Sequence, residues 1–170
     1  FKNLVKNIIS GNEQGASHMA DGYARVTGKP GVVVCDSDTS GTNTITGLQT
    51  ANMDSAPIVV FICHFSEDDK LSNVFNQIDH IGISRSTTKH NFWVEDVMDL
   101  SRIVREALYL SVTGRPGAIL VDIPKHVLFS EYKFNFPKID KVSGYSIPKE
   151  AKNSDINKAA NLIMKAKRPI

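Results

Sequence analysis

The feature of this sequence that most constrains the fold is the alternation of short apolar runs with longer segments of helical spacing. The apolar runs are Gly31 to Cys35, Ile58 to Cys63 and Ala118 to Ile123. Runs of this length are typical of parallel strands that are buried on both faces. Because a helical segment precedes each run, we predict an α/β domain with an open parallel sheet and helices on both faces.

The helical spacing predicts where the first three helices lie. The first runs from about Glu13 to Val26 and the second from Thr42 to Met53, while Gly114 and Pro116 close the third. The segment Asn7 to Ser10 has a strand-like pattern. The residues expected to face the core are Ala16, Met19, Ala20 and Tyr23 in the first helix, and Ile103, Val104, Ala107, Leu108 and Val112 in the third.

The composition changes after Pro124, where prolines and lysines become frequent. Residues 129–152 are therefore expected to form an extended surface linker, which leaves residues 1–128 as one domain. Asn153 or Ser154 can cap a further helix, so residues 153–170 are expected to begin a following domain. The fold is accordingly expected to be incomplete at both ends.

Charge and cysteine content exclude several classes of function. The chain has 20 lysine and arginine residues against 18 aspartate and glutamate residues, so nucleic acid is not an expected partner. Cys35 and Cys63 lie in apolar runs and are expected to be reduced core thiols. No membrane segment, secretion signal or metal-ligand spacing is apparent, so we expect a cytoplasmic protein without a metal site in this chain. Any organelle-targeting peptide would lie upstream.

Glu13 is the most promising site residue on placement alone. It stands between the strand-like segment and the first helix, and ligands of open α/β sheets bind at the carboxyl ends of the strands. The alternative is a first-turn glutamate that only stabilises the helix through its dipole. His64, which follows a strand, is a less favoured candidate for a general base.

Four blocks of the sequence carry a resemblance to a known family. They are EQGASHMADGYARVTGKPGVVV, TNTITGLQTANMDSAPIVV, DHIGISRSTTKHNFWVED and GRPGAILVDIPK, in that order. In order and spacing they resemble the pyrimidine-binding (PYR) domain of acetolactate synthase large subunits, which are thiamine-diphosphate enzymes. The similarity covers about Asn12 to Lys125. The segment from Asn153 resembles the beginning of that family's central domain, which is FAD- or nucleotide-binding-like.

The resemblance implies an activity for the parent protein. Such enzymes condense pyruvate with pyruvate or 2-oxobutanoate, release carbon dioxide, and serve branched-chain amino-acid synthesis. The implied cofactors are thiamine diphosphate, magnesium and, as an option, FAD. Glu13 matches the glutamate that shares a proton with N1′ of the aminopyrimidine ring, which makes it the implied catalytic residue.

Other site residues are implied only where positions match. Near the cofactor ring the matching residues are Thr39, Asn43 and Asn76, although a polar residue at the N-terminus of a helix is an equally good reading of Asn43. Ser55 and Arg115 match positions that touch FAD. Phe75, Lys89 and Lys125 match residues of the substrate channel. Without the family blocks, surface charges and caps would be the favoured reading of most of these residues.

This chain also departs from the family pattern. Asp38-Thr39-Ser40-Gly41 replaces a glycine-proline-glycine turn, and Cys63-His64-Phe65-Ser66 replaces a glycine-glutamine-valine-proline run. Phe75-Asn76-Gln77 replaces phenylalanine-glutamine-glutamate, and Asn12 replaces the usual histidine before the glutamate. Asn76 is one methylene shorter than the usual glutamine.

The motif that binds magnesium and diphosphate in these enzymes does not occur in the sequence. The resemblance therefore implies that another domain binds the metal and that a second copy of the subunit supplies it, with a regulatory subunit as a further partner. Two alternatives stay open. One is another thiamine-diphosphate decarboxylase or carboligase, such as an oxalyl-CoA decarboxylase, and the other is a non-catalytic dimerisation or binding module.

Overall fold

A computed structural model describes residues 5–36, 38–64, 78–138, 142–147 and 150–168. They form two compact units, residues 1–140 and 141–170. The strands of the first unit are β1 (Gly31–Cys35), β2 (Ile58–Cys63), β3 (His90–Trp93) and β4 (Ala118–Ile123). Its helices are α1 (Glu13–Thr27), α2 (Asp38–Asn43), α3 (Ile45–Met53), α4 (His80–Ser84), α5 (Val97–Val112) and α6 (Lys125–Leu128). The second unit contains α7 (Asn153–Lys165).

The four strands make one parallel sheet in the order β1-β2-β4-β3. In register, Gly31 pairs with Ile58, Ile58 with Ala118, and His90 with Ile119. All carboxyl ends of the strands consequently lie at one edge of the sheet, which we call the carboxyl edge, and all amino ends lie at the opposite, amino edge.

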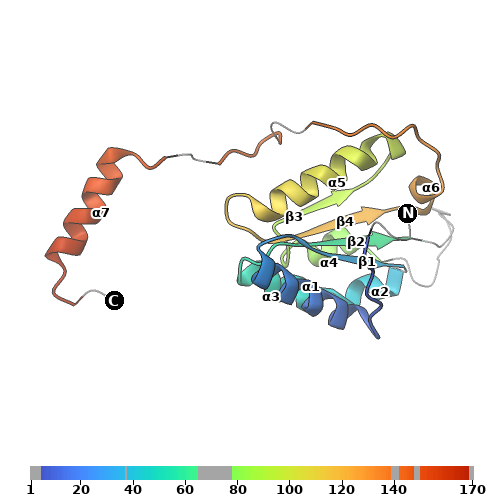
Figure 1. The fold of residues 1–170 in the computed structure, drawn as a ribbon, viewed down its shortest axis with the longest axis horizontal. Coiled ribbons are helices and arrows are strands. Elements are labelled where there is room, and N and C mark those ends of the chain that lie inside the picture. Colours follow the sequence, from blue (N-terminus) through green and yellow to red (C-terminus); the bar gives the residue numbers. More distant parts are fainter. Residues whose placement is uncertain (1–4, 37, 65–77, 139–141, 148–149, 169–170) are drawn as a thin grey trace. The chain divides into compact units, whose positions relative to one another are not determined.

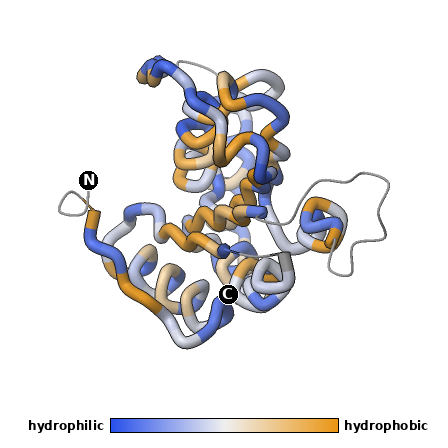
Figure 2. The backbone as a smooth tube through the Cα atoms, turned by 90° about the vertical axis from the view of Figure 1, so that its right-hand side faces the viewer, coloured by the Kyte–Doolittle hydropathy of each residue, from blue (hydrophilic) through white to orange (hydrophobic). Residues whose placement is uncertain are grey.

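Helices cover both faces of this sheet, as Figure 1 shows. α1 and α3 pack on one face, and α5 packs on the other face over β2, β3 and β4. The central strands β2 and β4 are almost wholly buried, and Figure 2 shows apolar colouring concentrated along the strands. The core between the sheet and α1/α3 consists of Ala20, Ala24, Val33, Cys35, Leu48, Ala51, Ala56, Ile58, Val60, Ile62, Ala118 and Leu120. The predicted α/β class is confirmed.

Glycine permits close packing of α1. A Cβ atom on Gly31 would collide with the backbone of Ala20, and one on Gly47 would collide with the side chain of Ser17. The first contact brings α1 against β1, and the second brings α3 against α1. Since α1 begins with Glu13, these contacts also fix the position of Glu13 relative to the carboxyl edge.

The predicted strands are confirmed residue for residue, but the sequence prediction was incomplete elsewhere. Residues 7–10 form no strand, so the strand-like reading of Asn7 to Ser10 was wrong. β3, α4 and α6 were not predicted. The expected helix from Thr42 to Met53 is two helices, because Thr44 bonds back to the carbonyl of Gly41 through both its backbone N–H (3.2 Å) and its hydroxyl (2.7 Å).

The predicted core stripe of α1 was also partly wrong. Ala20 is buried, but Met19 and Tyr23 are 47% and 50% exposed. The buried residues are Ser17, Ala20, Asp21 and Ala24, because this helix approaches its neighbours through small side chains. On α5, Ile103 and Ala107 are buried as predicted, whereas Val112 is exposed.

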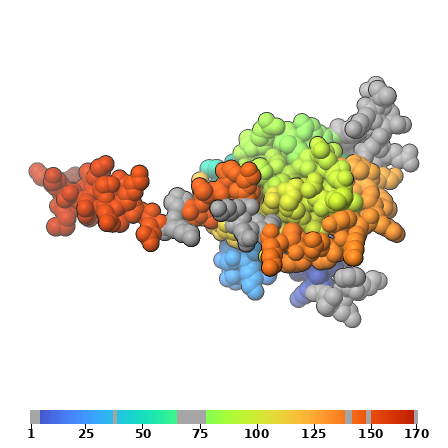
Figure 3. Space-filling model, turned by 90° about the horizontal axis from the view of Figure 1, so that it is seen from above, coloured from blue at the N-terminus to red at the C-terminus, as the bar shows by residue number. Residues whose placement is uncertain are grey.

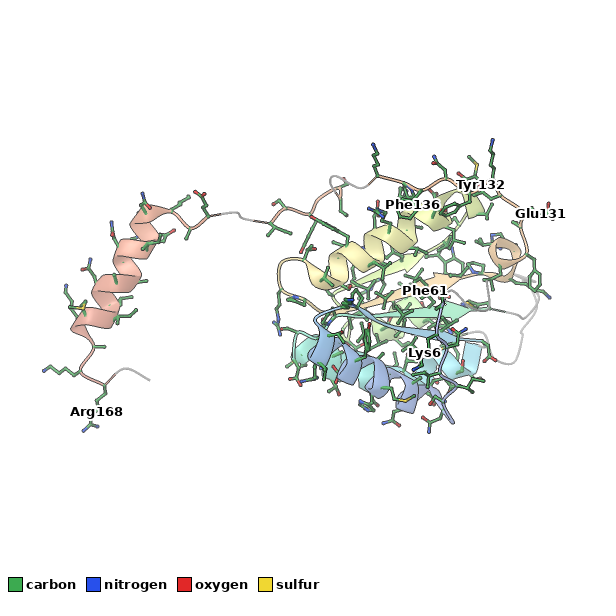
Figure 4. All side chains as sticks on the ribbon, in the orientation of Figure 1. Lys6, Phe61, Glu131, Tyr132, Phe136 and Arg168 are labelled. Carbon is green, nitrogen blue, oxygen red and sulfur yellow. The ribbon has the colours of Figure 1, made fainter. Side chains whose placement is uncertain are left out.

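The segment after α6 runs without helix or strand through residues 129–138. It lies along α5, because the guanidinium of Arg105 stacks on the ring of Phe136 at 4.5 Å (Figure 4). In Figure 3 this segment, coloured orange, lies against the side of the first unit on which α5 lies. The division between the two compact units falls inside the predicted linker.

The second unit confirms the predicted helix but not its cap. α7 begins at Asn153, and Lys152 occupies the N-cap position without a side-chain bond, so the capping role of Asn153 or Ser154 was wrong. None of the described residues of α7 is buried. Ile156, Leu162, Ile163 and Met164 are all more than half exposed.

Candidate functional site

Glu13 is held at the carboxyl edge by the start of α1. Asn12 caps the helix, since its side-chain oxygen accepts a hydrogen bond of 2.6 Å from the backbone N–H of Gly15. The hydroxyl of Ser10 donates to the carbonyl of Asn12 at 2.6 Å and braces the same turn. Asparagine is among the best N-cap residues, so Asn12 stabilises this helix start.

Asn43 is brought to Glu13 by α2. Its side-chain amide donates a hydrogen bond of 2.9 Å to Oε2 of Glu13, across 30 residues of sequence. Asn43 is the last residue of α2 and not an N-terminal residue of a helix, so the alternative reading of it as an N-terminal polar residue was wrong. Two candidate site residues from separate sequence blocks therefore meet at the carboxyl edge.

Beneath Glu13 lies the thiol of Cys35. Burial, assisted by the negative charge of Glu13, raises the pKa of Cys35 to about 12, although a hydrogen bond with Ser40 opposes the shift. Cys35 and Cys63 are buried and free, which confirms the prediction of reduced core thiols. The thiols are therefore protonated packing groups and not nucleophiles.

The other candidate residues for the cofactor ring and the substrate channel lie in different parts of the chain. Thr39 lies in α2, exposed, and its carbonyl accepts a hydrogen bond of 2.8 Å from the hydroxyl of Thr42. Lys125 begins α6 directly after β4, at the same edge as Glu13. Phe75 and Asn76 fall outside the described residues.

Lys89 lies at the opposite, amino edge of the sheet. Its ammonium group donates to the carbonyls of Leu110 at 2.5 Å and Thr113 at 2.7 Å, which are at the C-terminal end of α5. A lysine in this position satisfies exposed helix carbonyls and complements the helix dipole. The structure therefore gives Lys89 a local packing role and does not bring it to Glu13.

Ser55 and Arg115 meet each other at the amino edge. Nε of Arg115 donates to the hydroxyl of Ser55 at 2.9 Å, and Nη2 donates to the carbonyl of Met53 at 2.8 Å. Ser55 has a left-handed backbone with φ of 60° in the turn between α3 and β2. The two residues implied to touch FAD thus form one unit, on the opposite edge of the sheet from Glu13.

Sequence reasoning missed a buried pair at the carboxyl edge. His64 directly follows β2, and its Nε2 is hydrogen-bonded to the carboxylate of Asp122 in β4. The signal for it is the single aspartate within the apolar run Ala118 to Ile123, because a buried carboxylate needs a partner. Within the described ranges, no cluster of three or more histidine, cysteine or acidic side chains could hold a metal ion.

Comparisons with known proteins show what this chain is similar to. The sequence model for the thiamine pyrophosphate enzyme, N-terminal TPP binding domain, matches residues 2–83. The chain is 42% identical to the acetolactate synthase large subunit of Buchnera aphidicola subsp. Schizaphis graminum, over 98% of this chain and 29% of that protein. Residues 2–83 therefore resemble the N-terminal domain of thiamine pyrophosphate enzymes, and the chain as a whole is similar to an acetolactate synthase.

Two further relatives show the same similarity. The chain is 39% identical to the acetolactate synthase of Mycobacterium leprae, over 100% of this chain and 27% of that protein. It is 38% identical to the acetolactate synthase large subunit of Haemophilus influenzae, over 98% of this chain and 29% of that protein. The chain spans less than a third of the length of these relatives.

These comparisons confirm two expectations, namely the resemblance to acetolactate synthases and the fold of a thiamine-diphosphate-binding PYR domain. Thiamine diphosphate is the cofactor of this domain family. As for the membrane, no helix among the described residues has both the length and the apolar character needed to span one.

Proposed function

We propose that this chain supplies the pyrimidine-binding half of the active site of an acetolactate-synthase-type carboligase, and that Glu13 is its activating acid. The observation that carries the proposal is the hydrogen bond from Asn43 to Oε2 of Glu13 at the carboxyl edge. It holds a half-buried carboxylate at the edge where open α/β sheets bind ligands.

The residues at this edge fit the polar side of an aminopyrimidine ring. The amide of Asn43 donates to Oε2 of Glu13, and we propose that Oε1 is the atom that shares a proton with a ring nitrogen. Thr39 and Asn76 are proposed to complete the ring contacts. The bound cofactor supplies an electron sink for decarboxylation of a 2-oxo acid, and Glu13 holds the proton that tunes it.

Further residues are proposed to serve the rest of the active site. Phe75 and Lys125 are proposed to line the substrate channel for pyruvate and 2-oxobutanoate. Ser55 and Arg115 are proposed to contact FAD. Their mutual hydrogen bond supports this proposal, because it places the two side chains next to each other.

The domain organisation and the partners are part of the same proposal. Residues 1–128 are proposed as the PYR domain, 129–152 as a linker and 153–170 as the beginning of a central domain. Magnesium is proposed to be bound by a domain outside this chain, on a second copy of the subunit. A regulatory subunit is a further proposed partner, because several relatives are named large subunits.

The proposal is tested with Glu13→Gln in the full-length protein, with Glu131→Gln on the exposed segment as the matched control. Glutamine keeps the shape and the bond to Asn43 but cannot share the proton. We expect acetolactate formation to fall by about 10² to 10⁴-fold, with the fold intact by circular dichroism. Near-normal turnover by the Glu13 variant would reject Glu13 as the activating acid, whereas absence of turnover by the wild-type full-length protein would favour a non-catalytic binding module.

A further inference from the structure

The buried pair of His64 and Asp122 fixes the direction of an imidazole ring at the carboxyl edge. Asp122 is 1% exposed and His64 is 8% exposed. The backbone N–H of His64 also donates to the carbonyl of Ile123 at 3.0 Å, so both the backbone and the side chain of His64 are hydrogen-bonded to β4. Since the side-chain bond involves Nε2 of His64, the ring has one defined orientation.

A second histidine ring packs against this oriented one. His80 begins α4, is 1% exposed, and lies edge to face with His64 at 5.3 Å between ring centroids. Its own backbone is fixed, because the carbonyl of His80 accepts a hydrogen bond of 2.5 Å from the hydroxyl of Ser84. Asp79 caps the same helix by accepting from the N–H of Gly82 at 2.7 Å.

The ring of His80 in turn lies against the backbone of α2. A Cβ atom placed on Gly41 would come within 2.7 Å of Cε1 and 3.0 Å of Nδ1 of His80. It would also come within 2.7 Å of Cδ1 of Ile62. Gly41 stands two residues before Asn43 in the same short helix, so the position of His80 limits where Asn43 can be.

We propose that His64 and His80 are positioning residues that hold α2, and through it Asn43, in place against Glu13. The order of contact is Asp122 to His64, then His80, then Gly41, with Asn43 on the same helix. This inference rests on the proposed function of Glu13. A displacement of about 1 Å in a group near the reacting atoms can cost about 10²-fold in rate, so support of this kind has a large effect.

Hydrogen bonding explains why histidine rings, and not aliphatic side chains, lie between Asp122 and Gly41. An aliphatic residue at position 64 would leave the carboxylate of Asp122 buried without this partner, and it could also rotate among several packings. The bond to Asp122 instead gives His64 one orientation. Because His64 has a single orientation, it fixes the position of the His80 ring packed against it. The His80 ring in turn limits the position of the α2 backbone.

The first test uses Gly41→Ala in the full-length protein, with Gly22→Ala as its matched control. A Cβ atom on Gly22, which is also within a helix, would meet nothing within 4 Å. Hydrogen exchange is measured without cofactor at the amides of residues 39–44. We expect Gly41→Ala to speed exchange there by about tenfold or more and Gly22→Ala to leave it unchanged.

The double variant Gly41→Ala, His80→Ala then tests the contact itself. Removing the His80 ring gives the new methyl group room, so exchange in α2 should return toward the wild-type rate if the ring is the obstacle. Exchange that stays as fast as in Gly41→Ala, or a Gly41→Ala variant indistinguishable from wild type, overturns the proposal.

The second test measures His64→Leu beside the conservative variant His64→Gln. His64→Leu should raise the dissociation constant for thiamine diphosphate with magnesium by about tenfold, and glutamine, which can still donate to Asp122, should restore most of it. Faster exchange spread equally over the whole sheet would show a merely structural role and overturn the proposal. Because exchange in α2 is measured without cofactor, it reports this coupling even if Glu13→Gln proves fully active.

Discussion

The side-chain amide of Asn43 lies 2.9 Å from Oε2 of Glu13, which joins the end of α2 to the start of α1. Asn43 is exposed and Glu13 is half-buried, so this bond is partly accessible to water. A hydrogen bond from an amide to a carboxylate contributes about 1.5 to 3 kcal/mol when shielded and less here. Its main consequence is geometric, because it determines which carboxylate oxygen remains available.

Replacing Asn43 with aspartate should create a pH-dependent instability. Two carboxylates would face each other, and the repulsion raises the pKa of the pair in the folded state. A carboxyl group with a raised folded pKa is destabilising above that pKa, and the loss disappears as the pH falls through it. We expect a deficit of about 1 kcal/mol at pH 7 that vanishes near pH 4, measured by denaturant titration.

Asn43→Ala is the control for that experiment, because it removes the bond without adding charge. Its deficit should be independent of pH between 4 and 7. A pH-independent deficit in Asn43→Asp as well would mean that the two side chains are not neighbours.

Replacing Asn12 with alanine should loosen the start of α1. The cap to the N–H of Gly15 is lost, which costs about 1 kcal/mol, whereas Asn12→Asp keeps an acceptor and should cost far less. Hydrogen exchange at the first turn of α1 checks the result. Equal exchange rates in the two variants would count against the cap.

The free energy of unfolding should fall between pH 9 and 12 because of Cys35. Its pKa is about 12 in the folded protein against a reference value of 9.0, so over this range only the unfolded chain releases the proton. The slope is about 1.4 kcal/mol per pH unit. The measurement compares wild type with Cys35→Ala, so that lysine and tyrosine titrations cancel. Parallel curves for the two proteins would contradict the expected burial of the thiol.

Ser55 should tolerate glycine but not valine. Glycine relieves the left-handed backbone while losing the bond from Arg115, so Ser55→Gly should stay within about 0.5 kcal/mol of wild type. A β-branched residue at φ of 60° should cost about 2 kcal/mol or more. Thermal unfolding checks both values. In the full-length protein, a fall in FAD affinity for the still-folded Ser55→Gly would support the proposed contact, and unchanged affinity would oppose it.

The strands were predictable because their signal is local. The runs Ile58 to Cys63 and Ala118 to Ile123 are apolar throughout, since both faces are buried. β3 was missed because only four residues, His90 to Trp93, pair with β4, and neither end residue of β3 is buried. The sequence of β3, HNFW, therefore contains no continuous apolar run that could reveal it.

The candidate site was predictable only in part, because its contacts join distant residues. Glu13 could be placed from its position before a helix, but its bond with Asn43 depends on how α2 ends. His64 and Asp122 are 58 residues apart, and only the pairing of β2 with β4 brings them together. The burial of Met19 and Tyr23 was overestimated because helical spacing cannot show that small residues make the closest contacts of α1.

The strand β1 has a consequence for anyone who handles this chain in isolation. Among the residues that the structure describes, it is the outermost strand on its side of the sheet, and Val32 and Val34 are 52% and 67% exposed on the face away from α1. Unpaired backbone groups next to exposed valines are a template for strand addition by another molecule. We expect concentration-dependent, β-rich self-association of the isolated chain, and lysine at position 32 or 34 should suppress it.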